Sequence, residues 1–463
     1  MTAADLLIRD ADLVVTMDEA LGDLPGGWVA VTGGLITGLG TAADPPPPAL
    51  KAVDAGGCLV TPGLVNSHQH LYQNLTRSGD RPDLDGSLEA WFWHYFGMWS
   101  QLDEEAVRLS TAVGMAELAW SGCTTTVDHL YLHPRPGLLD AQIDEAARLG
   151  MRFTAVRGTM TMGEQNGGIC PDHLAEDEDA YLADCERLFA RHHDPAPSAM
   201  VRVAFGPTNL LSCTPSTMTR TAELADRLAV RLHTHVADDP EEHAFVTARY
   251  ERRPLEVLDS LGWLTERTWC AHVVYPSTAE MALLAERGVG VSHCPSSTVI
   301  GGGLPGGPTP VREMLDAGIA VGIGCDGATA ADHQSLWMET KTAMLLARLR
   351  GGTADAMPAR EALWMATRGG ARAIGREGEV GVLRHAACGD LAVWRMDTLP
   401  YAGALADPVT ALFNCGPTWA WHTVVGGRFL VEDGEPRITG LDETLRRHRE
   451  TERRIQGVTA PSL

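Results

Sequence analysis

The stretch TPGLVNSHQH, residues 61–70, is an apolar run that ends in two histidines, His68 and His70. Seven later stretches have a similar form, and long helical segments such as residues 103–122 lie between them. This alternation is typical of βα units, and eight such units favour a closed barrel over an open sheet. The predicted strands are residues 61–70, 123–129, 152–160, 201–209, 230–238, 268–274, 288–295 and 319–327.

Polar side chains of these eight runs gather at or near their C-terminal ends. They are His68, His70, Asp128, His129, Arg157, His233, His235, His272, His293 and Asp326. In a (β/α)8 barrel the active site is built at the C-terminal ends of the strands. The sequence therefore predicts that these side chains meet in one catalytic site.

The two ends of the chain have a different pattern. The first sixty residues alternate apolar and polar positions between glycine- and proline-rich breaks, and similar segments return at 389–397 and 421–436. Such segments indicate short antiparallel strands. We therefore expect an α/β protein with a TIM-like (β/α)8 barrel over residues 61–375. Residues 1–60 and 376–463 are expected to form a small composite β-sandwich and a C-terminal tail.

Composition restricts the partners and the compartment. The 463 residues carry a formal net charge of −23, which disfavours nucleic acid and anionic membrane, because both bind clustered Lys and Arg. The sequence shows no apolar stretch long enough to span a bilayer and no secretory pattern at its start. Its ten cysteines are scattered singly, as expected for reduced thiols. We expect a cytoplasmic protein that acts on a small molecule.

A metal site is predicted from four of the polar residues. His68 and His70 are two residues apart, so both can face the barrel axis and bind one ion. His235 and Asp326 would complete a set of three imidazoles and one carboxylate, which suits zinc and leaves a position for water. The alternatives are a core histidine at His235 and a helix N-cap at Asp326.

The same site offers groups for hydrolysis. A divalent ion lowers the pKa of its water from 15.7 to about 7 and so supplies hydroxide at neutral pH. Asp326 would accept a proton from this water, and His272 would orient the nucleophile or stabilise developing negative charge. His293 would contact the substrate or Asp326, and His233 has a supporting role.

An aromatic cluster, WFWHYFGMW at residues 91–99, allows two interpretations. It is either a helix packed on the core or, through Trp91, a wall of a substrate pocket for a flat ring.

Six segments taken together carry a family resemblance. They are PGLVNSHQHLYQNLTR, SGCTTTVDHLYLHP, RLHTHVADDPEE, LGWLTERTWCAHVV, GVSHCPSS and VREMLDAGIAVGIGCDG. The chain resembles the amidohydrolase superfamily in its mononuclear aminohydrolase branch, and within it the 8-oxoguanine deaminases, hydroxyatrazine aminohydrolase and triazine hydrolase.

The resemblance implies one zinc or iron ion held by His68, His70, His235 and Asp326, with His272 assisting the attack, in a homodimer or higher homo-oligomer. It also implies substrate contacts at Tyr72, Gln73 and Arg157.

The chain departs from this branch at one position. The branch has HxxE, whose glutamate protonates a ring nitrogen and passes protons to departing ammonia, whereas the third residue after His235 is Asp238. Aspartate has the same chemistry but is one methylene shorter, and a misplacement of about 1 Å can cost on the order of a hundredfold in rate. Asp239 and Glu241 are better explained as capping and first-turn acids of the next helix.

The predicted function is metal-dependent hydrolytic deamination of an aminated N-heterocycle of purine, pterin or triazine type, with Asp238, His272 and Asp326 as catalytic residues. One alternative keeps the site but changes the bond that is hydrolysed, to a carbon–halogen bond, a carbon–sulfur bond or the amide bond of a cyclic amide. The other is a catalytically impaired homologue, because Asp238 replaces the glutamate.

Overall fold

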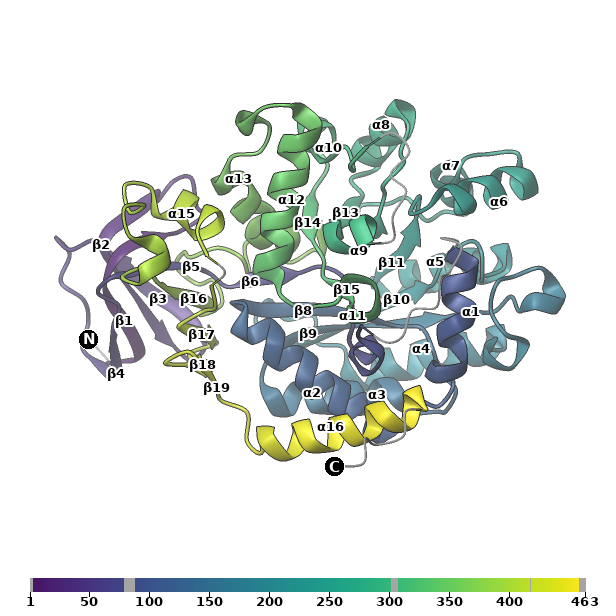
Figure 1. Ribbon diagram of the computed structural model, residues 1–463, viewed down its shortest axis with the longest axis horizontal. Helices are drawn as coiled ribbons and strands as arrows, with labels where there is room; N and C mark the ends of the chain where they lie inside the picture. Colours follow the sequence, from purple (N-terminus) through teal and green to yellow (C-terminus); the bar gives the residue numbers. More distant parts are fainter. Residues whose placement is uncertain (1–2, 79–87, 301–306, 417, 458–463) are drawn as a thin grey trace.

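The computed structural model describes residues 3–78, 88–300, 307–416 and 418–457. Within these ranges a closed barrel of parallel strands occupies the centre of the molecule, and a β-sheet lies at one side of it (Figure 1). The order around the barrel is β10-β11-β12-β13-β14-β6-β8-β9, and pairing of β9 with β10 closes the ring. All eight predicted strand regions contribute to this barrel, so the predicted fold class is confirmed.

The strands have the following bounds: β1 Ala4–Val15, β2 Asp23–Thr32, β3 Leu35–Gly40, β4 Ala49–Asp54, β5 Cys58–Pro62, β6 Leu64–Asn66, β7 Gln69–His70, β8 Cys123–Leu130, β9 Arg152–Thr159, β10 Val201–Pro207, β11 Arg231–Val236, β12 Thr268–His272, β13 Gly290–His293, β14 Val321–Ile323, β15 Asp326–Gly327, β16 Leu391–Arg395, β17 His422–Val425, β18 Arg428–Glu432 and β19 Glu435–Pro436.

The helices have the following bounds: α1 Leu88–Trp99, α2 Glu104–Trp120, α3 Leu138–Leu149, α4 Glu178–His192, α5 Pro215–Leu228, α6 Pro240–Tyr250, α7 Pro254–Ser260, α8 Thr278–Arg287, α9 Pro295–Ile300, α10 Val311–Asp316, α11 Ala328–Ala331, α12 Leu336–Gly351, α13 Ala359–Trp364, α14 Gly370–Ala373, α15 Pro408–Asn414 and α16 Leu441–Gln456. Short helical turns are η1 Leu71–Thr76, η2 Glu164–Asn166, η3 Asp172–Leu174, η4 Ala354–Ala356, η5 Met365–Gly369 and η6 Leu399–Tyr401.

Apolar side chains fill the barrel interior on the N-terminal side of the polar residues that end the strands. Val65, Val127, Val156, Ala204 and Trp269, from five different strands, form one fully buried apolar cluster. Because side chains alternate along a strand, the residues two positions further along each strand lie on the same inner face. These residues are Ser67, His129, Gly158, Gly206 and Ala271, so the layer next to the packed cluster consists of one histidine and four small residues.

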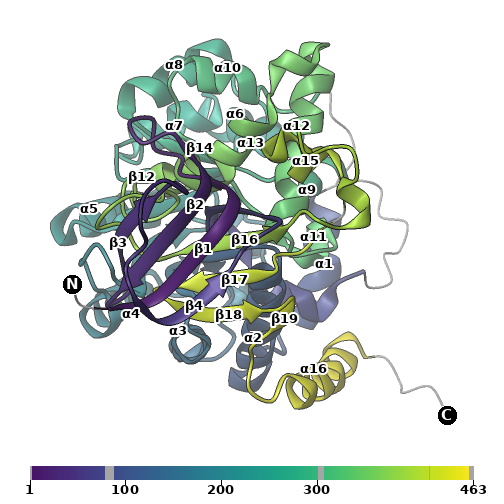
Figure 2. The ribbon, with the colours of Figure 1, turned by 90° about the vertical axis from the view of Figure 1, so that its left-hand side faces the viewer.

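Both ends of the chain build the neighbouring sheet. In the described residues it is one continuous sheet of nine strands, to which β1–β4 and β16–β19 contribute (Figure 2). The C-terminal β16 pairs antiparallel with the N-terminal β5, with Val393 opposite Val60. Its apolar core combines both chain ends, including Ile8, Val31 and Val424. The predicted composite β-domain is thus present, as a single sheet continued across the two termini.

The C-terminal helix α16 returns to the barrel and lies alongside α2 (Figure 1). His448 on α16 bonds through Nε2 to Asn74 Oδ1 at 2.8 Å, and Gln456 donates to the carbonyl of Leu75 at 2.8 Å. Asn74 and Leu75 belong to η1, the turn directly after His70. A helix from the far end of the sequence therefore braces the segment that follows the first two histidines. Among the described helices, none combines the length and apolarity that crossing a bilayer needs.

Candidate active site

A chain of hydrogen bonds fixes the tautomer of His68. His233 bonds through Nδ1 to the carbonyl of Trp269 at 2.9 Å, and a carbonyl can only accept, so this Nδ1 carries the proton. The neutral His233 ring must then accept at Nε2, which lies 2.7 Å from His68 Nδ1. His68 in turn is protonated at Nδ1, and its buried Nε2, which has no hydrogen-bond partner, presents a lone pair.

His70 and His235 are held in the same tautomer. His70 donates from Nδ1 to the carbonyl of His129 at 2.7 Å, and His235 donates from Nδ1 to the carbonyl of Thr208 at 2.8 Å. Burial, together with the nearby His68, lowers the pKa of His70 to about 3 and holds the pKa of His235 well below its usual range. Both rings are therefore neutral at pH 7, and their Nε2 lone pairs face each other at 3.1 Å.

Asp326 completes the set from the end of the eighth strand. Its Oδ1 lies 3.4 Å from the Nε2 atoms of both His68 and His70. Burial opposes ionisation, but the contact with His68 and the nearby His272 and His70 outweigh it and hold the pKa of Asp326 far below its usual range. The backbone at Asp326 is left-handed, with φ 56°, and the carboxylate faces His68 and His70.

These four side chains fit a divalent cation. Three neutral imidazole lone pairs and one carboxylate oxygen converge on a buried point, and without a cation the lone pairs would repel one another. The ligands predicted from sequence, His68, His70, His235 and Asp326, are thus the residues that the fold brings together, and they would hold one divalent metal ion. His129 belongs to other close histidine groups; its Nε2 donates to the carbonyl of Gly206 at 2.6 Å, and its buried Nδ1 has no hydrogen-bond partner.

Asp238 and His272 form an acid–imidazole pair at the rim of this cluster. Asp238 Oδ1 lies 3.4 Å from His272 Nδ1, and the Asp238 side chain keeps 31% of its surface exposed, whereas His272 is buried. Burial and the neighbouring carboxylates of Asp326 and Asp239 raise the pKa of Asp238, against an opposing effect of His272. The ring of His272 lies 5.4 Å from that of His235, in a stacked arrangement. An acid with a raised pKa therefore lies beside the histidine cluster.

The predicted substrate contacts on η1 surround the same point. Tyr72 and Gln73 are buried, and the hydroxyl of Tyr72 and the Oε1 of Gln73 have no hydrogen-bond partner in the protein. A Cβ atom added to Gly327 would lie 1.8 Å from Gln73 Oε1. Because Gly327 directly follows Asp326, the Gln73 amide lies beside Asp326. Buried polar atoms without partners mark positions where a ligand or water can bond.

His293 lies at the end of a barrel strand, whereas Trp91 lies on the helix α1. His293 ends β13, is buried with an unpartnered Nδ1, and has its pKa lowered to about 3 by burial, with a further effect of His272. Trp91 lies on α1, half-buried, with its ring 5.5 Å from Trp99, which in turn contacts Tyr72 at 5.4 Å. The aromatic cluster is thus a helix packed on the core, and it reaches the site through Trp99.

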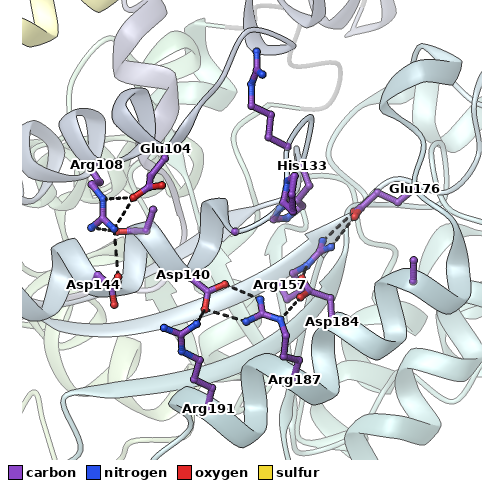
Figure 3. A pocket seen from close by; sticks show the side chains of 15 residues that line it. Glu104, Arg108, His133, Asp140, Asp144, Arg157, Glu176, Asp184, Arg187 and Arg191 are labelled. Carbon is purple, nitrogen blue, oxygen red and sulfur yellow. Dashed lines mark hydrogen bonds and ion pairs between the residues drawn. The ribbon is translucent and has the colours of Figure 1, made fainter.

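Arg157 is placed differently from the prediction. Its guanidinium bonds to Glu176 at 2.6 Å and to Asp184 at 2.7 Å, in a charged pocket of about 700 Å³ formed with α2, α3 and α4 (Figure 3). Val156, the preceding residue, belongs to the barrel interior, so strand alternation turns Arg157 outward. The structure therefore supports an ion-pair role for Arg157 instead of the predicted substrate contact.

Two residues that lie near the site were not identified from the sequence. Tyr131 follows β8, and its ring packs edge-on against His70 at 5.1 Å. Its space depends on Gly158, where a Cβ would lie 2.6 Å from the Cβ of Tyr131. Glu242 is buried and accepts a bond from the backbone N–H of Asp238. Glu242 stands one helical turn after Asp238, a spacing that could have drawn attention to it, whereas nothing in the local pattern singles out Tyr131.

The barrel with three imidazoles and a carboxylate at its C-terminal end defines a metal-dependent hydrolase. A family model described as "Amidohydrolase family" matches residues 59–429, and the chain belongs to that family. It is 39% identical over 430 residues to the 8-oxoguanine deaminase of Pseudomonas aeruginosa, which covers 92% of this chain and 94% of the relative. It is 36% identical over 482 residues to an isoxanthopterin deaminase from an unknown prokaryotic organism, and this match covers 96% of this chain and 98% of the relative.

A solved structure agrees with this assignment. The atrazine chlorohydrolase of Arthrobacter aurescens, crystallised with zinc, superposes on this chain with a TM-score of 0.89 and a sequence identity of 31%. The superposition covers 96% of this chain and 100% of the chlorohydrolase chain. The resemblance to the aminohydrolase branch is therefore confirmed, and a divalent metal is supported by both the donor set and this neighbour.

Proposed function

We propose that this protein hydrolytically removes an amino group, as ammonia or a small amine, from an aminated N-heterocycle of purine, pterin or triazine type. The observation that carries the proposal is the pair formed by Asp238 and His272, 3.4 Å apart, next to the converging lone pairs of the histidine cluster. A proton donor beside a metal site is the arrangement that hydrolysis of a ring C–N bond needs. The two deaminases among the relatives support the same reaction.

Zinc is the proposed ion, and iron is the alternative. Imidazole and carboxylate ligands suit both metals, and zinc is present in the atrazine chlorohydrolase structure. When bound, such an ion lowers the pKa of a water molecule and so makes a nucleophile available at neutral pH.

The protein's own residues divide the remaining work. Asp326, ionised at neutral pH, accepts the proton that the attacking water gives up. Asp238 donates a proton to the ring nitrogen next to the attacked carbon and becomes a carboxylate. As the tetrahedral intermediate collapses, this carboxylate takes the proton of the new hydroxyl group and delivers it to the leaving amine. The proton held by Asp326 then restores the acid form of Asp238. His272 fixes the direction of the Asp238 carboxyl, while Tyr72 and Gln73 offer their unpartnered polar atoms to the heterocycle.

The test is a screen for ammonia or amine release. Zinc- or iron-loaded protein is incubated with aminated purines, pterins, pyrimidines and triazines, and the released amine is quantified alongside the metal content. We expect turnover of at least one compound and its loss in Asp238→Asn. No turnover of any compound by metal-replete protein would contradict the proposal.

A second candidate function changes only the leaving group. The name of the Arthrobacter aurescens neighbour, atrazine chlorohydrolase, refers to loss of chloride, so the same fold can serve dehalogenation in that protein. Mass spectrometry of the products separates the two reactions, because deamination releases ammonia or amine, whereas dehalogenation releases halide. An impaired homologue is the remaining alternative, and gain of rate in Asp238→Glu would support it.

We further propose that the protein works in the cytoplasm as a homodimer or larger homo-oligomer, without nucleic acid or membrane partners. Exposed apolar side chains on α12, Leu345 at 49% and Leu349 at 72%, offer a surface for such self-association. Light scattering of the purified protein tests the oligomeric state, and a monomer at micromolar concentration would contradict it.

A further inference from the structure

The peptide unit that joins Ala237 to Asp238 is held from both of its polar ends. Its carbonyl, on Ala237, accepts bonds from the N–H groups of Val274 at 2.8 Å and Tyr275 at 3.1 Å. Its N–H, on Asp238, donates to Glu242 Oε2 at 2.9 Å. Because a peptide unit is planar, bonds at both ends fix its orientation and with it the position of the Asp238 Cα.

These bonds connect the elements that carry the acid–imidazole pair. Val274 and Tyr275 follow His272 along the chain, and Glu242 lies on α6, the helix that begins after Asp238. The clamp therefore ties the backbone of Asp238 to the segment that carries its partner. Ala237 has φ 54° and His272 has φ 71°, left-handed conformations that are unfavourable for residues other than glycine and need surrounding structure to hold them.

The geometry at Glu242 differs from ordinary helix capping. In a capping box the third residue of the helix bonds to the backbone N–H of the N-cap residue. The N-cap of α6 is Asp239, whose side chain accepts from the N–H of Glu241, as the sequence predicted. Glu242 instead reaches one residue further back, to Asp238. It is 2% exposed, and its other oxygen, Oε1, is buried without a hydrogen-bond partner.

We propose that Glu242 is a positioning residue that locks the Ala237–Asp238 peptide, so that the short side chain of Asp238 meets the substrate proton beside His272. The inference rests on the proposed function of Asp238 as proton carrier. An aspartate has one side-chain torsion fewer than a glutamate, so its carboxyl can adjust less and depends more on the backbone beneath it. A backbone shift of about 1 Å would then cost on the order of a hundredfold in rate.

The test compares two substitutions of Glu242 in the zinc-loaded full-length protein. Glu242→Gln keeps an oxygen acceptor for the Asp238 N–H, whereas Glu242→Met fills the same space without one. We expect Glu242→Met to lower kcat by about tenfold to a hundredfold with KM changed less than about threefold. Glu242→Gln should keep kcat within about threefold of wild type, and so should the control Glu241→Gln on the exposed side of α6.

A structural readout separates this inference from the proposed function. Crystal structures of zinc-loaded Glu242→Met and Glu242→Gln should show the Asp238 carboxylate displaced from His272 only in the methionine variant. This readout remains if the wild type deaminates no heterocycle, in which case the proposed function fails and the clamp stands. An unchanged Asp238–His272 contact in Glu242→Met, or equal loss of kcat in both variants, would overturn the inference.

A further variant covers the case in which Glu242→Met does not fold. In Glu242→Asp the carboxylate is one methylene too short to reach the Asp238 N–H from the same helix position. We expect this variant to lose kcat while Glu242→Gln retains it, and the reverse order would overturn the inference as well.

Discussion

The Nε2 atoms of His70 and His235 face each other at 3.1 Å, although each ring donates its Nδ1 proton to a main-chain carbonyl. Neither Nε2 can therefore donate to the other while both rings are neutral. The protein has built a site in which two lone pairs point at one another, an arrangement that a bound cation stabilises. Five expected outcomes follow from this site and its surroundings.

Metal removal should destabilise the protein. A ligand that binds only the folded state adds about 4 kcal/mol when its free concentration is a thousand times Kd. We therefore expect chelator-treated protein to unfold at a clearly lower Tm, and stoichiometric zinc to restore the original Tm, whereas magnesium does not. Equal Tm values for the chelated and the zinc-loaded protein would show that the converging lone pairs hold no ion.

His233→Ala should weaken metal binding without removing a ligand. His233 accepts the Nδ1 proton of His68 and so orients its Nε2, and loss of such an outer partner typically costs 10- to 100-fold in metal affinity. Competition with a chromophoric zinc chelator measures the change. His385→Ala, at an exposed histidine, is the matched control and should bind zinc like the wild type.

Asp238→Asn should abolish turnover while leaving the metal in place. The amide has the same shape but is not acidic enough to act as a general acid near neutral pH, and loss of a general acid typically costs about a hundredfold to ten-thousandfold. Steady-state kinetics and metal analysis on the same sample measure both effects. Asp239→Asn is the control, because asparagine also caps helices well. If Asp238→Asn were still active, a group other than Asp238 would have to be the proton donor.

Arg157→Met should reduce stability more than catalysis. The buried guanidinium holds Glu176 and Asp184, and removing one member of a buried ion-pair group typically costs about 3–5 kcal/mol. Urea unfolding measures the loss, and KM measured below the unfolding transition should stay near that of the wild type. Arg446→Met, in an exposed pair, should change the stability far less than Arg157→Met does. A large rise in KM in Arg157→Met would instead indicate that Arg157 contacts the substrate.

Glu339 should make stability fall as pH rises. Burial raises the pKa of this carboxyl to about 8 in the folded protein, from an ordinary value near 4.5. Between these pH values the folded state holds a proton that the unfolded chain has released. The free energy of unfolding should then fall by up to about 1.4 kcal/mol per pH unit in this window and level off above pH 8.

The matched comparison for this pH dependence is Glu339→Gln, which keeps an acceptor for the N–H of Ser296 but cannot ionise. Denaturant unfolding from pH 5 to 9 should show a shallower decline for this variant than for the wild type. Glu286→Gln, at an exposed position, should leave the decline unchanged. Parallel curves for Glu339→Gln and the wild type would mean that the carboxyl is already ionised in the folded state.

The sequence by itself predicted the barrel, the β-sheet built from both chain ends and the four side chains that meet at the strand ends, which we propose as metal ligands. This was possible because each of these features has a local signature. Apolar runs alternate with helical segments, and the histidines stand two residues apart at strand ends, where the (β/α)8 topology brings them together.

Only the tertiary structure decided the tautomers of the histidines, the direction of Arg157 and the role of Glu242. Each depends on groups distant in sequence: a carbonyl on a neighbouring strand for His235, two acids beyond β9 for Arg157, and for Glu242 a peptide held from its other end by the segment after His272. The side-chain alternation of a strand shows which residues share a face. It does not show which main-chain groups remain free to bind them, because backbone pairing between strands is settled only when the barrel closes.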